Sequence, residues 1–162
     1  MKISISRKLI VSIVMVVVGA AMAAMSGISW SQASESQSGV QLVADEHLAT
    51  LTVTDIQPGD EVSRLVTIHN SASGPARIDF TEQGDAADYR DGQLRLSIDV
   101  SGREIYAGTF GAMADLTQDM GEIGAGESVT FRFTVSLPDD VSYVGPGRET
   151  ATASYAWVLV PG

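Results

Sequence analysis

The sequence predicts an all-β domain, an antiparallel sandwich of two sheets, and three observations favour this class. Short runs in which apolar and polar residues alternate recur from Val40 onward, and turn residues such as Gly, Pro, Asn and Asp separate them. About six to eight such runs, each apolar on one side, are typical of a two-sheet sandwich. The chain shows no strand–long helix–strand pattern, which argues against a parallel α/β sheet.

The alternating runs give the expected order of strands. The first run, 40–44, lies in an N-terminal extension of residues 34–47, and the sandwich domain is expected to cover 48–162. The Pro58-Gly59 and Ser101-Gly102 pairs mark two of the turns. Within the domain, strands are predicted at 48–54, 62–70, 76–82, 93–102, 104–108, 128–137 and 149–160.

One short helix is predicted around 110–117, because Phe110, Met113, Ala114 and Leu116 recur there at helical spacing. The core is predicted from the two longest alternating runs. Phe131, Phe133 and Val135 share one side of the first, and Tyr155 and Trp157 share one side of the second. These last two could instead form an exposed ligand-binding patch, but their alternation favours packing in the core.

The N-terminus has the order of a secretory signal peptide. Lys2, Arg7 and Lys8 precede a predominantly apolar run, 9–25, and small residues follow at Ser31 and Ala33. We therefore predict a signal peptide of residues 1–33, cleaved between Ala33 and Ser34. The alternative is an uncleaved membrane anchor, although the apolar run is slightly shorter than the ~20 residues of a typical span.

Composition limits the partners of the exported chain. All 20 acidic residues follow Ala33, and the seven basic residues that remain are all Arg, which gives a net charge of −13. Such a surface repels nucleic acid and anionic lipid, so we expect contact with a membrane only through the signal segment during export. The absence of Cys excludes disulfides, thiolate metal sites, a Cys nucleophile and a lipoprotein anchor.

One phrase occurs twice in the chain. "DIQPGDEVSRLVTIHN" (55–70) is repeated as "EIGAGESVTFRFTVSLP" (122–138). In each copy a Gly can supply a turn with positive φ, and the flanking acids can cap it. The repeat predicts two strands that enter the core from similar turns, and it implies no catalysis. The matched pairs, all at one constant offset, are Ile56/Ile123, Gly59/Gly126, Val62/Val129 and Thr67/Thr134.

Four phrases in order resemble the TasA/camelysin family of exported bacterial proteins. They are the first copy of the repeat with "SASGPARIDF", then "LRLSIDVSGREIYAG", then "MGEIGAGESVTFRFTVSLPDD", then "ATASYAWVLV". The resemblance covers about Leu48 to Val160, and "GISWSQASES" resembles the region where a dedicated signal peptidase processes such proteins. It implies a jelly-roll-like sandwich that assembles into biofilm-matrix fibres or coats cells.

The sequence contains few candidates for catalytic or metal-ligating residues. Camelysin-type relatives are labelled metalloendopeptidases, but His47 and His69 are the only histidines and no H-E-x-x-H motif is present. Asp85, Asp88 and Asp91 recur at every third position of an acidic loop and are the best candidates for a Ca²⁺ site. Their spacing does not match an EF-hand, and a solvated loop is the favoured interpretation. We expect no cofactor and no enzymatic activity.

The sequence thus predicts a secreted structural subunit of extracellular matrix or cell-surface fibres, whose partners are copies of itself and other matrix components. Assembly is expected through β-strand addition, in which a mobile segment beginning at Ser34 pairs with the edge of the next subunit. Val40 and Leu42 would fill pockets there. The alternatives are a monomeric surface-binding or accessory sandwich and a camelysin-like metalloendopeptidase.

Overall fold

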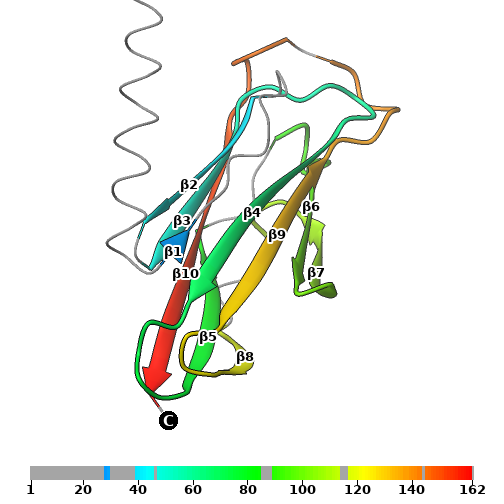
Figure 1. Cartoon of the computed structure of the whole chain (residues 1–162). Coiled ribbons are helices and arrows are strands. Elements are labelled where there is room, and N and C mark those ends of the chain that lie inside the picture. The colour runs from blue at the N-terminus through cyan, green and yellow to red at the C-terminus, as the bar shows by residue number, and fades with distance from the viewer. Residues whose placement is uncertain are drawn as a thin grey trace, which may run out of the picture.

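A computed structural model of the chain describes residues 28–29, 39–45, 47–84, 89–113, 117–143 and 145–161. Figure 1 shows two antiparallel sheets packed face to face. Sheet A has the strand order β1 (Ile28–Ser29), β4 (Glu61–His69), β9 (Ser128–Ser136), β6 (Arg95–Val100) and β7 (Arg103–Thr109). Sheet B has the order β2 (Val40–Asp45), β3 (Leu48–Val53), β10 (Ala151–Pro161), β5 (Ala76–Gln83) and β8 (Gln118–Ile123).

The strand order is that of a jelly roll. The neighbours β4-β9-β6-β7 face the neighbours β3-β10-β5-β8, and the chain crosses between the sheets at almost every connection. This is the eight-stranded, double Greek-key arrangement of jelly rolls, with β1 added beside β4 and β2 added beside β3. The predicted class, an antiparallel two-sheet sandwich of jelly-roll type, is confirmed.

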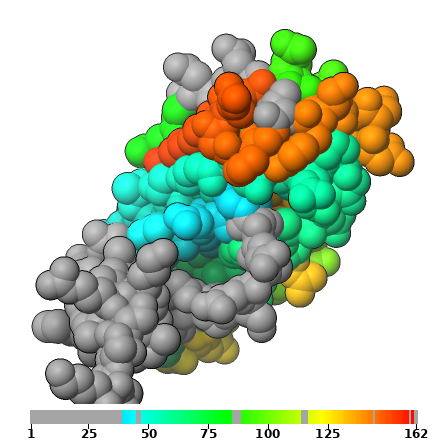
Figure 2. Space-filling model, turned by 90° about the horizontal axis from the view of Figure 1, so that it is seen from above, coloured from blue at the N-terminus to red at the C-terminus, as the bar shows by residue number. Residues whose placement is uncertain are grey.

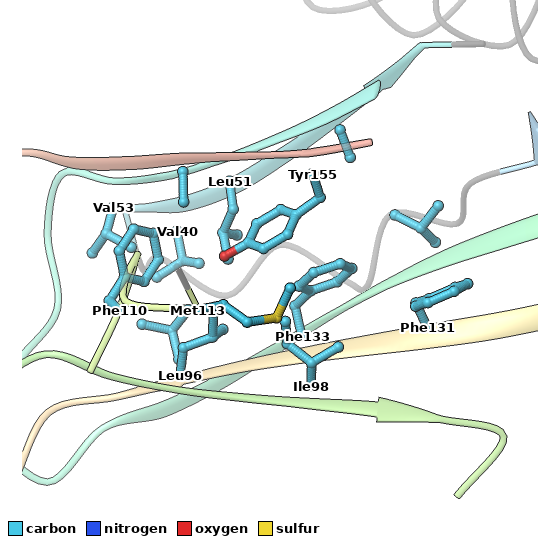
Figure 3. Close-up of a cluster of buried hydrophobic side chains, with 14 of the residues drawn as sticks. Val40, Leu51, Val53, Leu96, Ile98, Phe110, Met113, Phe131, Phe133 and Tyr155 are labelled. Atoms are coloured by element: carbon cyan, nitrogen blue, oxygen red, sulfur yellow. The ribbon is translucent and has the colours of Figure 1, made fainter. Parts of the chain in front are cut away.

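Alternation of apolar residues places the core between the two sheets. Phe131, Phe133 and Val135 on β9 are fully buried, as is Tyr155 on β10, and Trp157 is 2% exposed. Figure 3 shows the Tyr155 and Phe133 rings approaching each other between the sheets, and their centroids lie 4.8 Å apart. Since the chain has no disulfide, this aromatic cluster carries much of the stability.

The helix predicted around 110–117 is wrong for the residues described in that stretch. Phe110 and Met113 are buried, but they reach the core from an irregular loop in which Gly111 has a φ of 74°. The Met113 nitrogen donates to the Glu82 carboxylate at 2.8 Å instead of to a helical carbonyl. Residues 114–116 lie outside the described chain. The strand β8, which follows, was not predicted.

The repeated phrase forms two neighbouring strands, β4 and β9, which pair without a register shift. Leu65 lies opposite Arg132, and these two residues are also each other's counterpart in the repeat. The two copies are therefore related by an approximate two-fold axis that passes through this pair.

The turns obey the same symmetry. Gly59 has a φ of 84° and donates to the Leu137 carbonyl at 2.8 Å, while Gly126 has a φ of 74° and donates to the Asn70 carbonyl at 2.9 Å. An acid caps each turn, as predicted. Asp60 accepts from the nitrogen of residue 57 at 3.1 Å, and Glu127 accepts from that of residue 124 at 2.8 Å.

Within the described part of the chain, no helix is long and apolar enough to span a membrane. The predicted cleavage position, Ala33–Ser34, lies outside the described residues. Of the predicted signal peptide, the structure describes only β1.

Candidate strand-addition site

The four outer strands of the two sheets differ in how they are protected against pairing with another chain. On β7, Ile105 interrupts the register with β6, and Arg103 and Glu104 are exposed. On β8, the register with β5 also shifts, and Gly121 has a φ of 90°. Bulges and charges of this kind discourage further strand addition.

On the opposite side of the sandwich, β2 and the strand next to the two-residue β1, which is β4, show no register shift in their described pairings. β2 pairs with β3 in unbroken register over six residue pairs, and β4 pairs with β9 in unbroken register over nine. β2 and β4 contact each other, so both regular edges lie along one side of the molecule (Figure 1). A regular edge can accept a strand, which makes this side the candidate assembly surface.

β1 covers a small part of the β4 edge. Ile28 lies opposite Ile68 and Ser29 lies opposite Thr67, and these are the two pairs that the described residues form on that edge. Because β1 belongs to the predicted signal peptide, cleavage after Ala33 would remove it. The outer edge of β4 would then lose this pairing.

The structure places the predicted assembly residues within the sandwich. β2 pairs with the β3 of its own chain, Val40 is 1% exposed in the core, and Leu42 packs against the core from the same strand. Residues 40–45 are thus a strand of sheet B here, and the two residues 46 and 47 connect them to β3.

The start of β2 is held by main-chain contacts that depend on Gly39. The Gly39 carbonyl accepts from the Thr54 nitrogen at 2.7 Å and from the Thr54 hydroxyl at 3.1 Å. A Cβ at position 39 would lie 2.4 Å from the Asp55 nitrogen, so no other residue fits without movement.

Arg64 binds the next carbonyl along β2. Its Nε and Nη2 donate to the Val40 oxygen at 3.1 and 2.7 Å, and its Nη1 donates to the Ser63 oxygen at 2.9 Å. Partial burial lowers the pKa of Arg64 from its ordinary value, but a guanidinium remains charged at any physiological pH. We call the outer edge of β3, together with Thr54, Asp55 and Arg64, the acceptor edge.

The segment that precedes β10 also contacts the acceptor edge. The Gly147 nitrogen donates to the Thr54 oxygen at 2.7 Å, and the Tyr143 hydroxyl donates to Asp55 at 3.0 Å. Figure 2 shows this loop, drawn in orange, lying against the turquoise stretch that follows β3. Thr54 and Asp55 are thereby fixed independently of β2.

The recognition of β2 uses chemistry that any chain of similar shape can satisfy. Arg64 and Thr54 bind carbonyl oxygens, which every residue provides. Position 39 must be small, and position 40 must be apolar because its side chain enters the core. The sequence had pointed to Val40 and Leu42, but Arg64 and Gly39 were missed. An Arg at an inward-facing position of an apolar alternation was the available signal for Arg64.

Of the other predicted site residues, the two histidines lie at different sheets. Asp91 is exposed, and Asp85 and Asp88 lie outside the described residues. Among the residues that the structure describes, no group of three or more His, Cys, Asp or Glu could hold a metal ion. His47 is exposed beside β3 in sheet B, whereas His69 ends β4 in sheet A and contacts the Ser128 hydroxyl at 3.1 Å.

A shallow groove of about 300 Å³ lies on the outer face of sheet A. Arg132 and Asp99 are neighbours on β9 and β6 there, and the Ser101-Gly102 turn closes one end. Its lining is mixed, with apolar surface exceeding the polar surface. The remaining lining residues are Leu65 and Thr130.

No family model and no curated protein matches the chain. One similar solved structure is the secreted serine protease VesC from Vibrio cholerae, with 10% sequence identity, a TM-score of 0.31 and coverage of 68% of this chain and 21% of that one. The chain therefore spans about a fifth of that protein's length. Another is titled "AvmM Catalyzes Macrocyclization in Alchivemycin A Biosynthesis", with 12% identity, a TM-score of 0.30 and coverage of 73% and 90%. Similarity this low carries no argument about function.

Proposed function

We propose that the protein is an exported structural subunit that assembles into extracellular fibres by exchanging β2 between neighbouring copies. The observation that carries this proposal is the way in which β2 is held. β2 pairs with β3 in unbroken register, and Arg64 and Thr54 bind the main-chain carbonyls of Val40 and Gly39, contacts that the β2 of another copy can make equally. Export and the resemblance to the TasA/camelysin family, both inferred from sequence, agree with it.

Exchange explains why an assembly strand is also part of the domain. If β2 left its own β3 and paired with the β3 of the next copy, Val40 would enter the same core position and Arg64 of the acceptor would bind the same carbonyl. Exchange of this kind costs little because each contact that is broken is formed again. A head-to-tail exchange does not close on itself, so it produces a filament.

The activity in this proposal is self-association, and the partners are other copies together with other matrix components. No cofactor and no catalytic step is invoked. The mature protein would be secreted and would remain associated with the matrix or the cell surface. The acidic surface keeps nucleic acid and anionic lipid away from it.

The test uses a disulfide that locks β2 onto its own β3. Val43 and Thr50 lie directly opposite each other on these strands, and the chain has no other Cys. The mature protein with Val43→Cys and Thr50→Cys should form fibres visible by electron microscopy when it is reduced. It should remain monomeric when it is oxidised, because β2 can no longer leave its strand.

The matched control locks two strands that exchange does not separate. Thr52 and Thr152 are opposite each other on β3 and β10, so the pair Thr52→Cys and Thr152→Cys should form fibres in both redox states. Fibres of equal number from the oxidised Val43/Thr50 protein would show that β2 is not exchanged. A mature wild-type protein that stays monomeric at high concentration would refute the fibre function itself.

The runner-up is a monomeric surface domain that binds a ligand, and the groove beside Arg132 favours it. In that case the locked protein would behave like the wild type. An Arg132→Ala variant would then lose ligand binding without any change in sedimentation.

A further inference from the structure

The main-chain groups of β4 point alternately towards β9 and away from it. The Leu137 nitrogen donates to the Asp60 oxygen and the Asn70 nitrogen donates to the Glu127 oxygen, so the even-numbered positions bond to β9. The odd-numbered positions therefore direct their N–H and C=O groups towards the opposite side of the strand. We call this row of groups the β4 edge. It is formed by Glu61, Ser63, Leu65, Thr67 and His69.

β1 shows that the β4 edge accepts an antiparallel strand. Ser29 lies opposite Thr67 and Ile28 lies next to it, opposite Ile68, so β1 covers one end of the nine-residue strand. Because β1 belongs to the predicted signal peptide, cleavage after Ala33 removes it. In the part of the mature chain that the structure describes, no other strand pairs with the β4 edge, which leaves it open to a further strand.

The sequence of β4 is complementary to itself across this edge. If a second copy lies antiparallel with a two-fold axis at Leu65, the two Leu65 side chains are neighbours on the outer face of sheet A. Ser63 of each copy then lies opposite Thr67 of the other. Glu61 lies opposite His69, so an acid meets an imidazole at both ends. A shift by two residues loses this match, because Glu61 would lie opposite Thr67 or opposite Ser71, beyond the strand.

The charges of β4 also permit a second copy to approach. Although the chain is strongly acidic, β4 has one acid, Glu61, and two side chains that can carry a positive charge, Arg64 and His69. The acids of the two flanking turns are Asp60 and Glu127. They accept hydrogen bonds from main-chain nitrogens of their own turns at 3.1 and 2.8 Å. Opposite charges therefore meet at both ends of the pairing.

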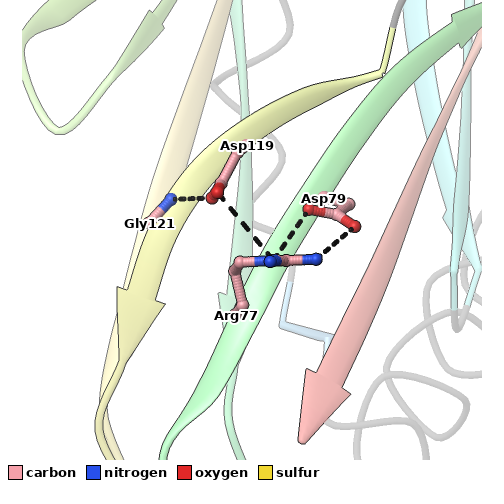
Figure 4. A network of polar contacts seen from close by, with 4 residues as sticks. All are labelled: Arg77, Asp79, Asp119 and Gly121. Carbon is pink, nitrogen blue, oxygen red and sulfur yellow. Dashed lines mark hydrogen bonds and ion pairs between the residues drawn. The ribbon is translucent and has the colours of Figure 1, made fainter. Parts of the chain in front are cut away.

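β8, an outer strand of sheet B, shows the contrast. It has two acids, Asp119 and Glu122, and no basic residue. Figure 4 shows that Asp119 is engaged within its own sheet, where it lies 3.9 Å from the Arg77 Nε and accepts from the Gly121 nitrogen at 2.8 Å. Two copies of β8 would bring like charges together along an edge whose register is already shifted.

We propose that, once β1 is removed, the β4 edges of two copies pair antiparallel about Leu65 and join the two A sheets into one continuous sheet. The partner is thus a second copy of this chain. Main-chain hydrogen bonds hold the two strands together, and the Glu61–His69 pairs set the register. This contact is isologous and closes as a dimer, unlike the head-to-tail exchange of β2. It depends on the predicted cleavage but not on fibre formation.

Arg64 already binds one acceptor of the β4 edge. Its Nη1 donates to the Ser63 oxygen at 2.9 Å, which uses one of the two lone pairs of that carbonyl. The other lone pair can accept from the Thr67 nitrogen of the second copy. Nine residues at about 3.4 Å each make a contact about 30 Å long and one strand wide. A standard interface buries about 800 Å² on each partner, so we expect a reversible dimer.

A single cysteine tests the register, because the chain has no Cys and the two-fold axis places residue 65 opposite itself. Residues that exchange both main-chain hydrogen bonds have Cα atoms about 5.5 Å apart, within the range of a disulfide. The mature Leu65→Cys protein should therefore form disulfide-linked dimers under mild oxidation. Ser63→Cys is the matched control, because the two copies of residue 63 would be separated by four residues, about 14 Å.

We expect dimers of Leu65→Cys to form several-fold faster than those of Ser63→Cys, measured on a non-reducing gel. A mixture of Ser63→Cys and Thr67→Cys proteins should give the mixed dimer, because these positions lie opposite each other. Equal rates for Leu65→Cys and Ser63→Cys would overturn the proposal. This result is also expected if residues 34–38 of the mature chain cover the β4 edge.

Charge exchange in the Leu65→Cys protein tests the Glu61–His69 pairs. His69→Glu places acids opposite each other and should lower the dimer yield several-fold, while addition of Glu61→Lys should restore it. Urea unfolding checks that each variant is folded. A yield that His69→Glu leaves unchanged, or that Glu61→Lys does not restore, would overturn the register and with it the proposal. The gel detects dimers whether or not fibres form, so a failure of β2 exchange does not affect this test.

Discussion

The two copies of the repeated phrase form similar turns and strands, but their side chains make different contacts. β4 and β9 enter from turns with the same hydrogen bonds, the same positive φ and the same acidic cap. β9 lies in the middle of sheet A, whereas β4 lies near its margin, beside β2. The side chains at matched positions differ accordingly.

The clearest difference is between Arg64 and Phe131, which are counterparts in the repeat and both point inward. Phe131 is fully buried in the aromatic cluster, while Arg64 is half-buried and binds the Val40 oxygen. An inward position on a central strand must be filled by apolar volume. A long side chain at the same position on a strand near the margin of the sheet can reach the edge strand of the other sheet.

A second difference lies at the strand ends. Asn70 is fully buried, and its side-chain amide donates to the carbonyls of Gly74, Ile123 and Gly124 at 3.0 to 3.1 Å. Its counterpart Leu137 is buried without polar contacts of its side chain. Asn70 therefore connects the loop after β4 to the turn before β9. The two copies of the repeated phrase thus share a backbone conformation, while the side chains at matched positions make different contacts.

The largest predicted loss of stability comes from truncating a buried core residue of β9, compared with its counterpart on β4. Phe133 and its counterpart Val66 are both fully buried. Phe133→Ala should cost about 3–5 kcal/mol of unfolding free energy, the usual loss for a buried Phe, whereas Val66→Ala removes less volume and should cost less. Urea unfolding measures both, and equal midpoints would mean that β9 does not carry the larger share of the core.

The next effect concerns Arg64. Arg64→Met keeps much of the apolar stem but removes the donors to the Val40 oxygen, and hydrogen bonds to charged groups contribute about 1.5–3 kcal/mol. The loss should be local, so amide hydrogen exchange should accelerate on β2 and β3 more than on β9. Phe131→Leu is the matched variant, and we expect it to affect β9 instead. Unchanged protection of β2 in Arg64→Met would show that Arg64 does not hold that strand.

Much of this comparison could be predicted from the sequence, and the reasons are local. Alternation gave the inward faces of β9 and β10, and the Gly-acid pairs gave the turns, because each depends on neighbouring residues. The pairing of the two copies could not be derived, because a phrase does not encode which strand lies beside it.

The errors have equally definite causes. Phe110 and Met113 have helical spacing, but a loop that contains Gly111 in a positive-φ conformation can place both in the core. β8 was missed because Met120 and Ile123 are the only large apolar residues of Gln118–Ile123 and lie three positions apart across a bulge, so the sequence shows no apolar alternation. The role of Arg64 depends on β2, which is distant along the chain.

The turns offer a test in which the two copies should respond alike. A Cβ at Gly126 would meet nothing within 4 Å, and at Gly59 only the Asp139 side chain at 3.6 Å. The cost of Gly59→Ala or Gly126→Ala is therefore backbone strain, about 1–2 kcal/mol for a residue held at positive φ. Thermal or urea unfolding should give equal losses for the two variants. A clear inequality would show that the turns are not equivalent.

The smallest effect concerns two hydroxyl pairs that the approximate two-fold axis relates. The Ser63 and Thr134 oxygens are 2.9 Å apart in an exposed position, and the Thr67 and Thr130 oxygens are 3.0 Å apart where they are partly buried. Thr134→Ala and Thr130→Ala should each cost under about 1 kcal/mol, because surface substitutions of this kind rarely exceed that. Of the two, Thr130→Ala should cost more, because its partner Thr67 is less accessible to water that could replace the lost bond. If Thr134→Ala proved the more costly in urea unfolding, solvent access would not be what distinguishes the two copies at this position.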